Sequence, residues 1–184
     1  MKKHKLIKFI FIIFILNVSN SYSLIEIDIT RGNLDPLPVA VSPLSQDMKS
    51  QKGFKKELNL DDLGSEISKV IENNLKQSGL FNALNKDAFL QKPDIAHLKP
   101  RFEDWALIKA QALITGKVLL DKNKLKVEFR LWDVLAAKEM LALAFTTVPS
   151  NWRRVGHIIT DKVYERLTGE KGYFDTRIIY VSEE

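Results

Sequence analysis

The sequence predicts an α/β domain in which a mixed sheet carries two main helices. Three observations lead to this prediction. Short segments that alternate apolar and polar residues, as half-buried strands do, occur near the start and in the middle of the chain. Two longer segments place apolar residues three and four positions apart, which is the spacing of amphipathic helices. The composition, 45% hydrophobic and 28% charged, is that of a globular protein.

The first 23 residues have the layout of a secretory signal peptide. Lysines precede the apolar run 9–16, and the small side chains of Ser21 and Ser23 suit a cleavage site after Ser23. The run is too short for a membrane-spanning helix, which needs about 20 apolar residues. We therefore expect residues 1–23 to direct export and to be removed. An uncleaved, membrane-anchoring N-terminus is the alternative.

The leader carries most of the excess positive charge. The whole chain has 28 Lys and Arg against 23 Asp and Glu, a net charge of +5. Four of the lysines and none of the acids lie in residues 1–23, so residues 24–184 have a net charge of +1. This balance gives little support to a nucleic-acid partner. The chain has no cysteine, which excludes disulfides and thiol catalysis.

A strand is predicted at the start of the exported chain, over Leu24–Thr30. Its apolar face would consist of Ile25, Ile27 and Ile29, and its polar face of Glu26, Asp28 and Thr30. After a break rich in polar residues, Leu37–Val41 predicts a second extended segment. The polar residues 46–56 show no pattern and predict a loop.

The first helix is predicted over Asp61–Ser78, because apolar residues recur there at spacings of three and four. Its two leading aspartates suit the positive end of a helix, and Gly79 suits a left-handed terminating residue. A short strand over Leu80–Leu84 and a loop over Gln91–Pro100 are expected to follow.

The middle of the chain predicts a short helix and then an antiparallel meander with one buried face. The helix, Arg101–Lys109, would turn Trp105 and Ile108 toward one core. The three strands are expected over Ala112–Leu120, Leu125–Leu131 and Met140–Val148, separated by tight polar turns.

The last helix is predicted to begin at Ser150, as its cap, and to end at Gly169. Arg153 and Arg154 in its first turn oppose the helix dipole, so we expect these arginines to have partners elsewhere in the molecule. A final strand is expected over residues 177–182.

Groups that could carry catalysis are few. His97, in a predicted loop, and His157, in the last helix, are the only histidines after the leader, and no zinc-binding spacing is present. We expect His157 to be a partly exposed helix residue. Neighbouring acidic residues on a helix point apart, and the glycines are too isolated for a phosphate-binding loop. The sequence therefore assigns no catalytic, cofactor-binding or metal-binding residue.

The predicted first strand is the candidate binding site. Cleavage after Ser23 would leave it without an upstream connection, so that it could pair with the edge of a partner's sheet. Backbone hydrogen bonds would then give affinity, and the isoleucine face would give specificity. The alternative is an ordinary edge strand of its own domain. The candidate partner-binding residues are Leu24, Ile25, Glu26, Ile27, Asp28, Ile29 and Thr30.

Three blocks of the sequence resemble the TolB family of the Tol-Pal system. The longest block runs from Asn151 to Glu183, and residues 102–116 and 131–134 support it. The resemblance covers essentially all of the chain after the leader. It departs from the family at Pro38–Leu44, where many relatives have a Pro-Ile-Ala-Val type of strand ending in Pro-Phe.

The resemblance implies a periplasmic binding protein and no enzyme activity. TolB proteins have an α/β domain, similar in topology to anticodon-binding domains, followed by a six-bladed β-propeller. The propeller binds the lipoprotein Pal, and the mature N-terminal segment can engage the inner-membrane protein TolA. On this chain, the TolA segment falls on residue 24 to about residue 36. Residues 24–184 would be the TolB-like α/β domain, with the propeller absent.

The expected function is therefore that of a periplasmic interaction domain that binds a TolA-like protein and supports outer-membrane integrity and envelope invagination during division. A Pal-like lipoprotein would be a partner only if a propeller is supplied elsewhere. We expect the protein to be peripheral to the membrane, with no cofactor and no nucleic acid. The alternatives are a periplasmic α/β enzyme or ligand-binding domain of unknown substrate and, on fold analogy alone, a nucleic-acid-binding domain.

Overall fold

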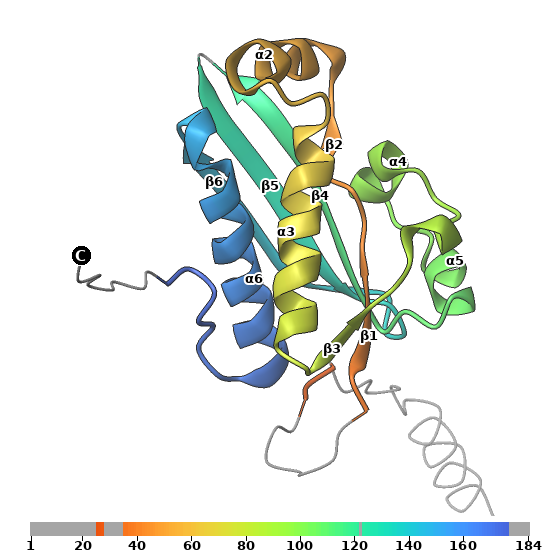
Figure 1. Cartoon of the computed structure of the whole chain (residues 1–184). Helices are drawn as coiled ribbons and strands as arrows, with labels where there is room; N and C mark the ends of the chain where they lie inside the picture. The colour runs from red at the N-terminus through yellow and green to blue at the C-terminus, as the bar shows by residue number, and fades with distance from the viewer. Residues whose placement is uncertain (1–24, 28–34, 122, 177–184) are drawn as a thin grey trace, which may run out of the picture.

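A mixed six-stranded sheet organises the fold (Figure 1). The computed structural model describes residues 25–27, 35–121 and 123–176. The strands are β1 Leu37–Val41, β2 Ser45–Gln46, β3 Phe81–Ala83, β4 Ala112–Asp121, β5 Lys124–Asp133 and β6 Lys138–Thr147. Their order in the sheet is β3-β1-β4-β5-β6, and β2 pairs with β4. The predicted α/β class with a mixed sheet is confirmed.

Parallel and antiparallel pairing divide the sheet into two halves. β1 lies between β3 and β4 and is parallel to both. β4, β5 and β6 form the predicted antiparallel meander, with a bulge between Leu131 and Trp132 where β5 faces β6. The strand predictions for the β1, β3, β4, β5 and β6 segments are confirmed, whereas the two-residue β2 was not predicted.

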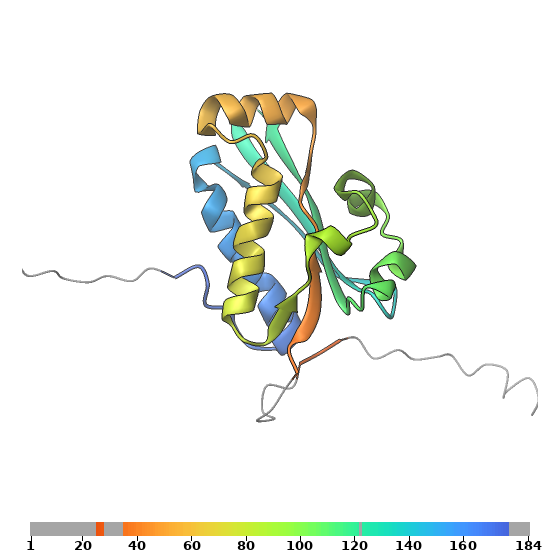
Figure 2. The same ribbon diagram turned by 45° about the vertical axis from the view of Figure 1, so that its right-hand side comes forward.

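The helices occupy both faces of the sheet and one end of it. They are α2 Met48–Leu58, α3 Leu63–Gln77, α4 Pro93–Leu98, α5 Phe102–Leu107 and α6 Trp152–Thr168, with 3-10 turns at Lys86–Ala88 and Pro149–Asn151. α3 and α6 lie side by side on one face, and these are the two main helices that the sequence predicts (Figures 1 and 2). α4 and α5 cover part of the other face, and α2 lies across one end.

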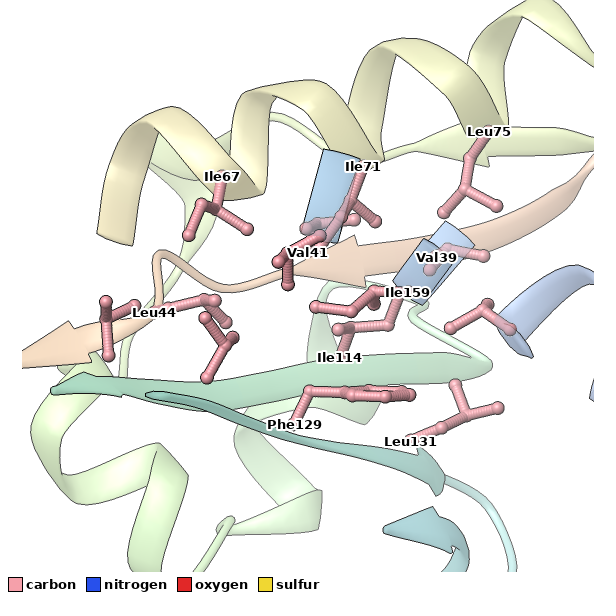
Figure 3. Packing of buried hydrophobic residues seen from close by; sticks show 14 of the residues in the cluster. Val39, Val41, Leu44, Ile67, Ile71, Leu75, Ile114, Phe129, Leu131 and Ile159 are labelled. Atoms are coloured by element: carbon pink, nitrogen blue, oxygen red, sulfur yellow. The ribbon is translucent and has the colours of Figure 1, made fainter. Parts of the chain in front are cut away.

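The main core fills the space between the sheet and the α3–α6 pair. Figure 3 shows Ile67, Ile71 and Leu75 of α3 with Val39, Val41 and Ile114 of the sheet, all fully or almost fully buried. The alternate residues Ala40 and Leu113 face the opposite side, where they pack with Trp105 of α5. β1 is thus covered on both faces, as expected for a strand that pairs in parallel with two neighbours.

The start of α3 is fixed by a cap and by a close approach. The Asp62 side chain accepts a hydrogen bond from the backbone N–H of Ser65 at 2.9 Å, which caps the helix. A Cβ added to Gly64 would lie 1.9 Å from the carbonyl oxygen of Leu44, so only glycine fits there. Gly79 follows the helix with φ +74°, as the sequence predicts.

Two predicted loops are helices in the structure. Residues 46–56 were predicted as a loop, but α2 forms there because Asp47 caps it through the N–H of Ser50 and Phe54 is fully buried. Residues 91–100 were also predicted as a loop, but α4 begins at Pro93 and buries only Ala96 and His97. Both helices have too few buried apolar residues to show a helical period.

The cap predicted for the last helix is wrong. α6 begins at Trp152, its N-cap is Asn151, and neither Asn151 nor Ser150 donates or accepts a side-chain capping bond. A 3-10 turn that starts at Pro149 leads into the helix instead. The end at Gly169, with φ +75°, is as predicted. The strand predicted over residues 177–182 lies outside the described residues.

The contact at Gly64 predicts a large effect of a small substitution. In Gly64→Ala, the methyl group would force the α3 N-terminus and the Leu44 carbonyl apart, and we expect the free energy of unfolding to fall by about 1–3 kcal/mol. Urea denaturation measures this change. Asn73→Ala, at an exposed position of the same helix, should change stability by less than about 0.5 kcal/mol; equal losses in the two variants would contradict the packing described.

Candidate functional site

The N-terminal segment lies against its own domain. Of the seven candidate partner-binding residues, the structure describes Ile25, Glu26 and Ile27. Ile25 and Ile27 are partly buried against the main core, and Glu26 is exposed, so the predicted alternation of inner and outer side chains holds here. The strand predicted over residues 24–30 is wrong for these three residues, which belong to no strand. Leu24, Asp28, Ile29 and Thr30 lie outside the described residues.

Two backbone hydrogen bonds hold this segment. The N–H of Ile25 donates to Oδ2 of Asp133 at 3.1 Å. The N–H of Ile27 donates to the carbonyl oxygen of Leu167 at 2.7 Å. Asp133 is the last residue of β5, and Leu167 is in the last turn of α6. The segment therefore bridges the end of the sheet and the end of the helix that covers it.

The buried side chain of Asp133 accepts hydrogen bonds from two backbone N–H groups. Its side chain is 1% exposed, and its Oδ1 accepts the N–H of Ala136 at 2.8 Å, which closes the turn between β5 and β6. Asp133 is not among the candidate residues predicted from the sequence. The sequence does contain a clue to it. Asp133 continues the buried alternation of β5 after Phe129 and Leu131, at a position where a hydrophobic residue would be expected.

The Leu167 carbonyl is an acceptor because α6 ends there. The last carbonyl groups of a helix have no partner within the helix. The left-handed Gly169 turns the chain away and donates its N–H to Glu165, which leaves the Leu167 oxygen for Ile27. The helix end thus provides a docking point for an extended chain.

Of the two arginines at the start of α6, Arg154 has a partner elsewhere in the chain, as expected from the sequence, whereas Arg153 lies against its neighbour Trp152. The guanidinium of Arg153 lies 4.4 Å from the ring centroid of Trp152. Arg154 binds the carboxylate of Asp175 through two nitrogens, with Nε at 3.1 Å from Oδ1 and Nη2 at 3.1 Å from Oδ2. Asp161 accepts the backbone N–H of Asp175. These contacts fix the segment after α6 along the helix.

The two histidines occupy different environments. His157 is half-buried on α6, as predicted, and its Nδ1 lies 2.9 Å from Nδ2 of Asn74 on α3, so it links the two main helices. His97 lies on α4, and its Nδ1 is buried without a hydrogen-bond partner among the described residues. Burial and the charge of Arg130 lower the pKa of His97 below its ordinary value of 6.5, although Glu128 opposes this shift.

A shallow cavity of about 250 Å³ lies beside His97 on the sheet face opposite the α3–α6 pair. Its lining includes Glu128 and Arg130 of β5 and Ala142 and Ala144 of β6. Within residues 25–27, 35–121 and 123–176, no three His, Cys, Asp or Glu side chains gather closely enough to hold a metal ion. None of the helices in these ranges is long and apolar enough to cross a membrane.

The family model of the TolB amino-terminal domain matches residues 25–140 of this chain, from the docked N-terminal segment to the start of β6. The chain belongs to the TolB amino-terminal domain family. It is 76% identical over 179 residues to the Tol-Pal system protein TolB of Pelagibacter ubique. That match covers 97% of this chain and 40% of the relative, so the chain spans about two-fifths of the relative's length.

The crystal structure of TolB from Acinetobacter baumannii supports the fold of this TolB domain. It matches with a TM-score of 0.61 and 20% sequence identity, over 77% of this chain and 30% of that chain. At this identity the likeness concerns the fold alone. The resemblance to TolB predicted from the sequence is confirmed, and the mixed sheet with two main helices is the architecture that it implied.

Asp133→Asn should loosen the docked segment. An amide has one acceptor oxygen, so it cannot serve the N–H groups of both Ala136 and Ile25 as the carboxylate does. We expect the amide oxygen to keep the shorter bond, which is the 2.8 Å bond to Ala136 and not the 3.1 Å bond to Ile25. We expect the amide proton of Ile25 to exchange with solvent at least about tenfold faster, which corresponds to roughly 1.4 kcal/mol. Hydrogen exchange followed by NMR measures this rate. Asp121→Asn, at an exposed position at the other end of the sheet, is the control, and equal exchange rates in all three proteins would contradict the contact.

His97 should make the stability depend on pH. Because folding lowers its pKa, the unfolded chain binds more protons, and the free energy of unfolding decreases as the pH falls below 6.5. We expect this loss between about pH 7 and about pH 5 to be smaller in His97→Gln, which has no group that titrates there. Thermal unfolding across this pH range measures the difference. Parallel pH curves for the two proteins would contradict the assignment.

Proposed function

We propose that this TolB domain works in the periplasm, where it binds a TolA-like protein through the segment Leu24–Thr30. In this role it would support outer-membrane integrity and envelope invagination during cell division. Residues 1–30 support the proposal beyond the family membership, because they have the layout of an export leader followed by an alternating isoleucine segment. Binding a Pal-like lipoprotein would require a propeller supplied elsewhere.

The observation that carries the proposal is the attachment of residues 25–27. Two backbone N–H groups of this segment are bonded to acceptors from two distant elements, and the residues themselves form no strand. A hydrogen bond of this kind contributes about 0.5–1.5 kcal/mol net, or about 1.5–3 kcal/mol with a charged acceptor. A partner that offers a full row of strand acceptors can therefore outcompete the docked state.

The side chains of residues 25–27 also suit the replacement of the docked state by a partner. In the docked state Ile25 and Ile27 rest against the core, and a partner must provide an apolar surface that replaces this contact. Glu26 is already exposed and lies between them. An acceptor sheet with an apolar groove flanked by basic side chains would match both faces of the segment. Domain and partner would then compete for the same two isoleucines.

A periplasmic enzyme or ligand-binding domain remains the second candidate, and one observation favours it. The cavity beside His97 brings an imidazole, a carboxylate and a guanidinium to one wall. However, Glu128 is paired with Lys126 at 2.7 Å, and Arg130 is paired with Glu139 at 3.1 Å, which leaves these charges committed to neighbours. We propose the binding function because residues 25–27 are held by two hydrogen bonds and by the packing of Ile25 and Ile27, and no ion pair between described side chains involves them.

Ile25→Asp with Ile27→Asp tests the proposal. The exported chain, with its leader removed, is titrated with the periplasmic part of a TolA-like protein from the same organism by calorimetry. We expect the affinity to fall by at least about 100-fold, because two charges would have to enter an apolar groove. Leu98→Asp with Leu107→Asp is the matched control, since both leucines are about three-quarters exposed and lie far from the segment in sequence.

Deletion of residues 24–30 should abolish the same binding. Unchanged affinity in the deleted protein, or an equal loss in the leucine control, would overturn the proposal. Circular dichroism of each variant shows whether the domain is folded, so that loss of binding can be assigned to the segment.

A further inference from the structure

Four lysines gather on the outer face of α2. Successive helix positions are about 100° apart, so Lys49, Lys52 and Lys56 fall within about 60° of one another around the helix axis, and Lys55 lies beside them. All four are exposed. By the same angles the position of Met48 falls between those of Lys52 and Lys55, and Gln51, beyond Lys55, is exposed and uncharged. These four lysines define the outer face of α2, and the one acid of the helix, Glu57, follows Lys56 in sequence.

The inner face of α2 holds the helix firmly in place. Phe54, almost opposite the lysines, is fully buried in the main core. A Cβ on Gly53 would lie 2.2 Å from Cδ2 of Leu120, so the helix is in close contact with β4. The hydroxyl of Ser50 accepts the N–H of Leu120 at 3.0 Å. The helix lies across one end of the molecule (Figures 1 and 2). Its four lysines are on the side away from the buried Phe54 and are exposed.

Among the described side chains, one ion pair involves this face. Lys55 forms an ion pair with Asp61 at 2.6 Å. None of the other ion pairs between described side chains involves Lys49, Lys52 or Lys56. Asp47, two residues before Lys49, is used as the helix cap. In addition, Lys49 stands in the first turn, where a positive charge opposes the helix dipole and costs stability.

We propose that the outer face of α2 binds the surface of a bilayer that contains anionic phospholipids. Protein interfaces are depleted in lysine and rich in aromatic residues and arginine, and the outer face of α2 has neither. Nucleic-acid sites also rely on arginine forks and aromatic stacking. A flexible ammonium group on a long stem suits a diffuse sheet of negative headgroups, which requires charge and no fixed geometry.

Binding would be electrostatic and would not involve insertion into the bilayer. Among the described apolar side chains of α2, Phe54 is in the core and Leu58 packs against it, so neither is available as an anchor for the hydrocarbon region. Each lysine close to an anionic surface contributes about a fivefold factor to binding. Such attraction is screened by salt over about 8–10 Å at physiological ionic strength. The face would position this end of the domain against a membrane independently of any partner held by residues 24–30.

Vesicle binding tests the proposal. The exported chain, with its leader removed, is mixed at low salt with vesicles of phosphatidylcholine that contain about one-third phosphatidylglycerol, and the bound fraction is measured by sedimentation. In Lys49→Gln with Lys52→Gln and Lys56→Gln we expect the partition coefficient to fall by about 100-fold. Lys99→Gln with Lys138→Gln and Lys171→Gln removes the same charge at exposed positions away from α2 and should fall by less than about fivefold.

Binding by the α2 face requires three results together, namely binding to the mixed vesicles, loss in the α2 variant, and loss of binding in high salt. Equal losses in the two triple variants would overturn the proposal, because net charge alone would then explain adsorption. Equal binding to pure phosphatidylcholine, no binding to mixed vesicles, or binding to isolated peptidoglycan in place of the vesicles would also overturn it. Circular dichroism shows whether both variants keep the helical content of the parent.

Discussion

The docking of the N-terminal segment depends on the hydrogen bonds of the Asp133 carboxylate. This carboxylate is buried at the end of β5, where one oxygen accepts the N–H of Ala136 and the other accepts the N–H of Ile25. The first bond closes the turn that leads into β6, and the second ties the N-terminal segment to the sheet. A buried carboxylate is stable only when its oxygens have donors, so release of the segment leaves one oxygen in need of a new partner, such as water. The fold and the availability of the segment are therefore linked through one side chain.

The α3–α6 pair provides the second hydrogen-bond acceptor for the N-terminal segment, the Leu167 carbonyl. α6 packs against α3 and against the buried strands, and Gly156 permits the close approach, since a Cβ there would lie 2.8 Å from Val70. That packing places the last turn of α6, with the free carbonyl of Leu167, beside the end of β5. The two acceptors for Ile25 and Ile27 thus come from elements that the main core holds together. At the other end of the same layers, α2 directs its lysines outward. The two surfaces that we propose for binding lie on separate parts of the domain.

The sequence predicts what repeats along the chain and misses what depends on distant contacts. The meander and the helices α3 and α6 have apolar periods over many residues, so their type and approximate bounds could be predicted. α2 buries Phe54 but exposes lysines at every third or fourth position, and α4 exposes Ile95 and Leu98, so neither shows an apolar stripe. At the candidate site, the alternation identified Ile25 and Ile27 correctly as inward-facing. Their acceptors are more than 100 residues away, and no local pattern connects a segment to such partners.

We propose that the domain and its partner compete for residues 24–30, and a measurement of affinity can test this competition. When only a fraction of the molecules is in the binding-competent state, the apparent dissociation constant equals the intrinsic one divided by that fraction. Asp133→Asn weakens the docked state without changing the segment itself. We predict that the TolA-like protein binds this variant more tightly than the parent chain in calorimetry at equal salt and pH. Equal or weaker binding by a folded Asp133→Asn protein would contradict it.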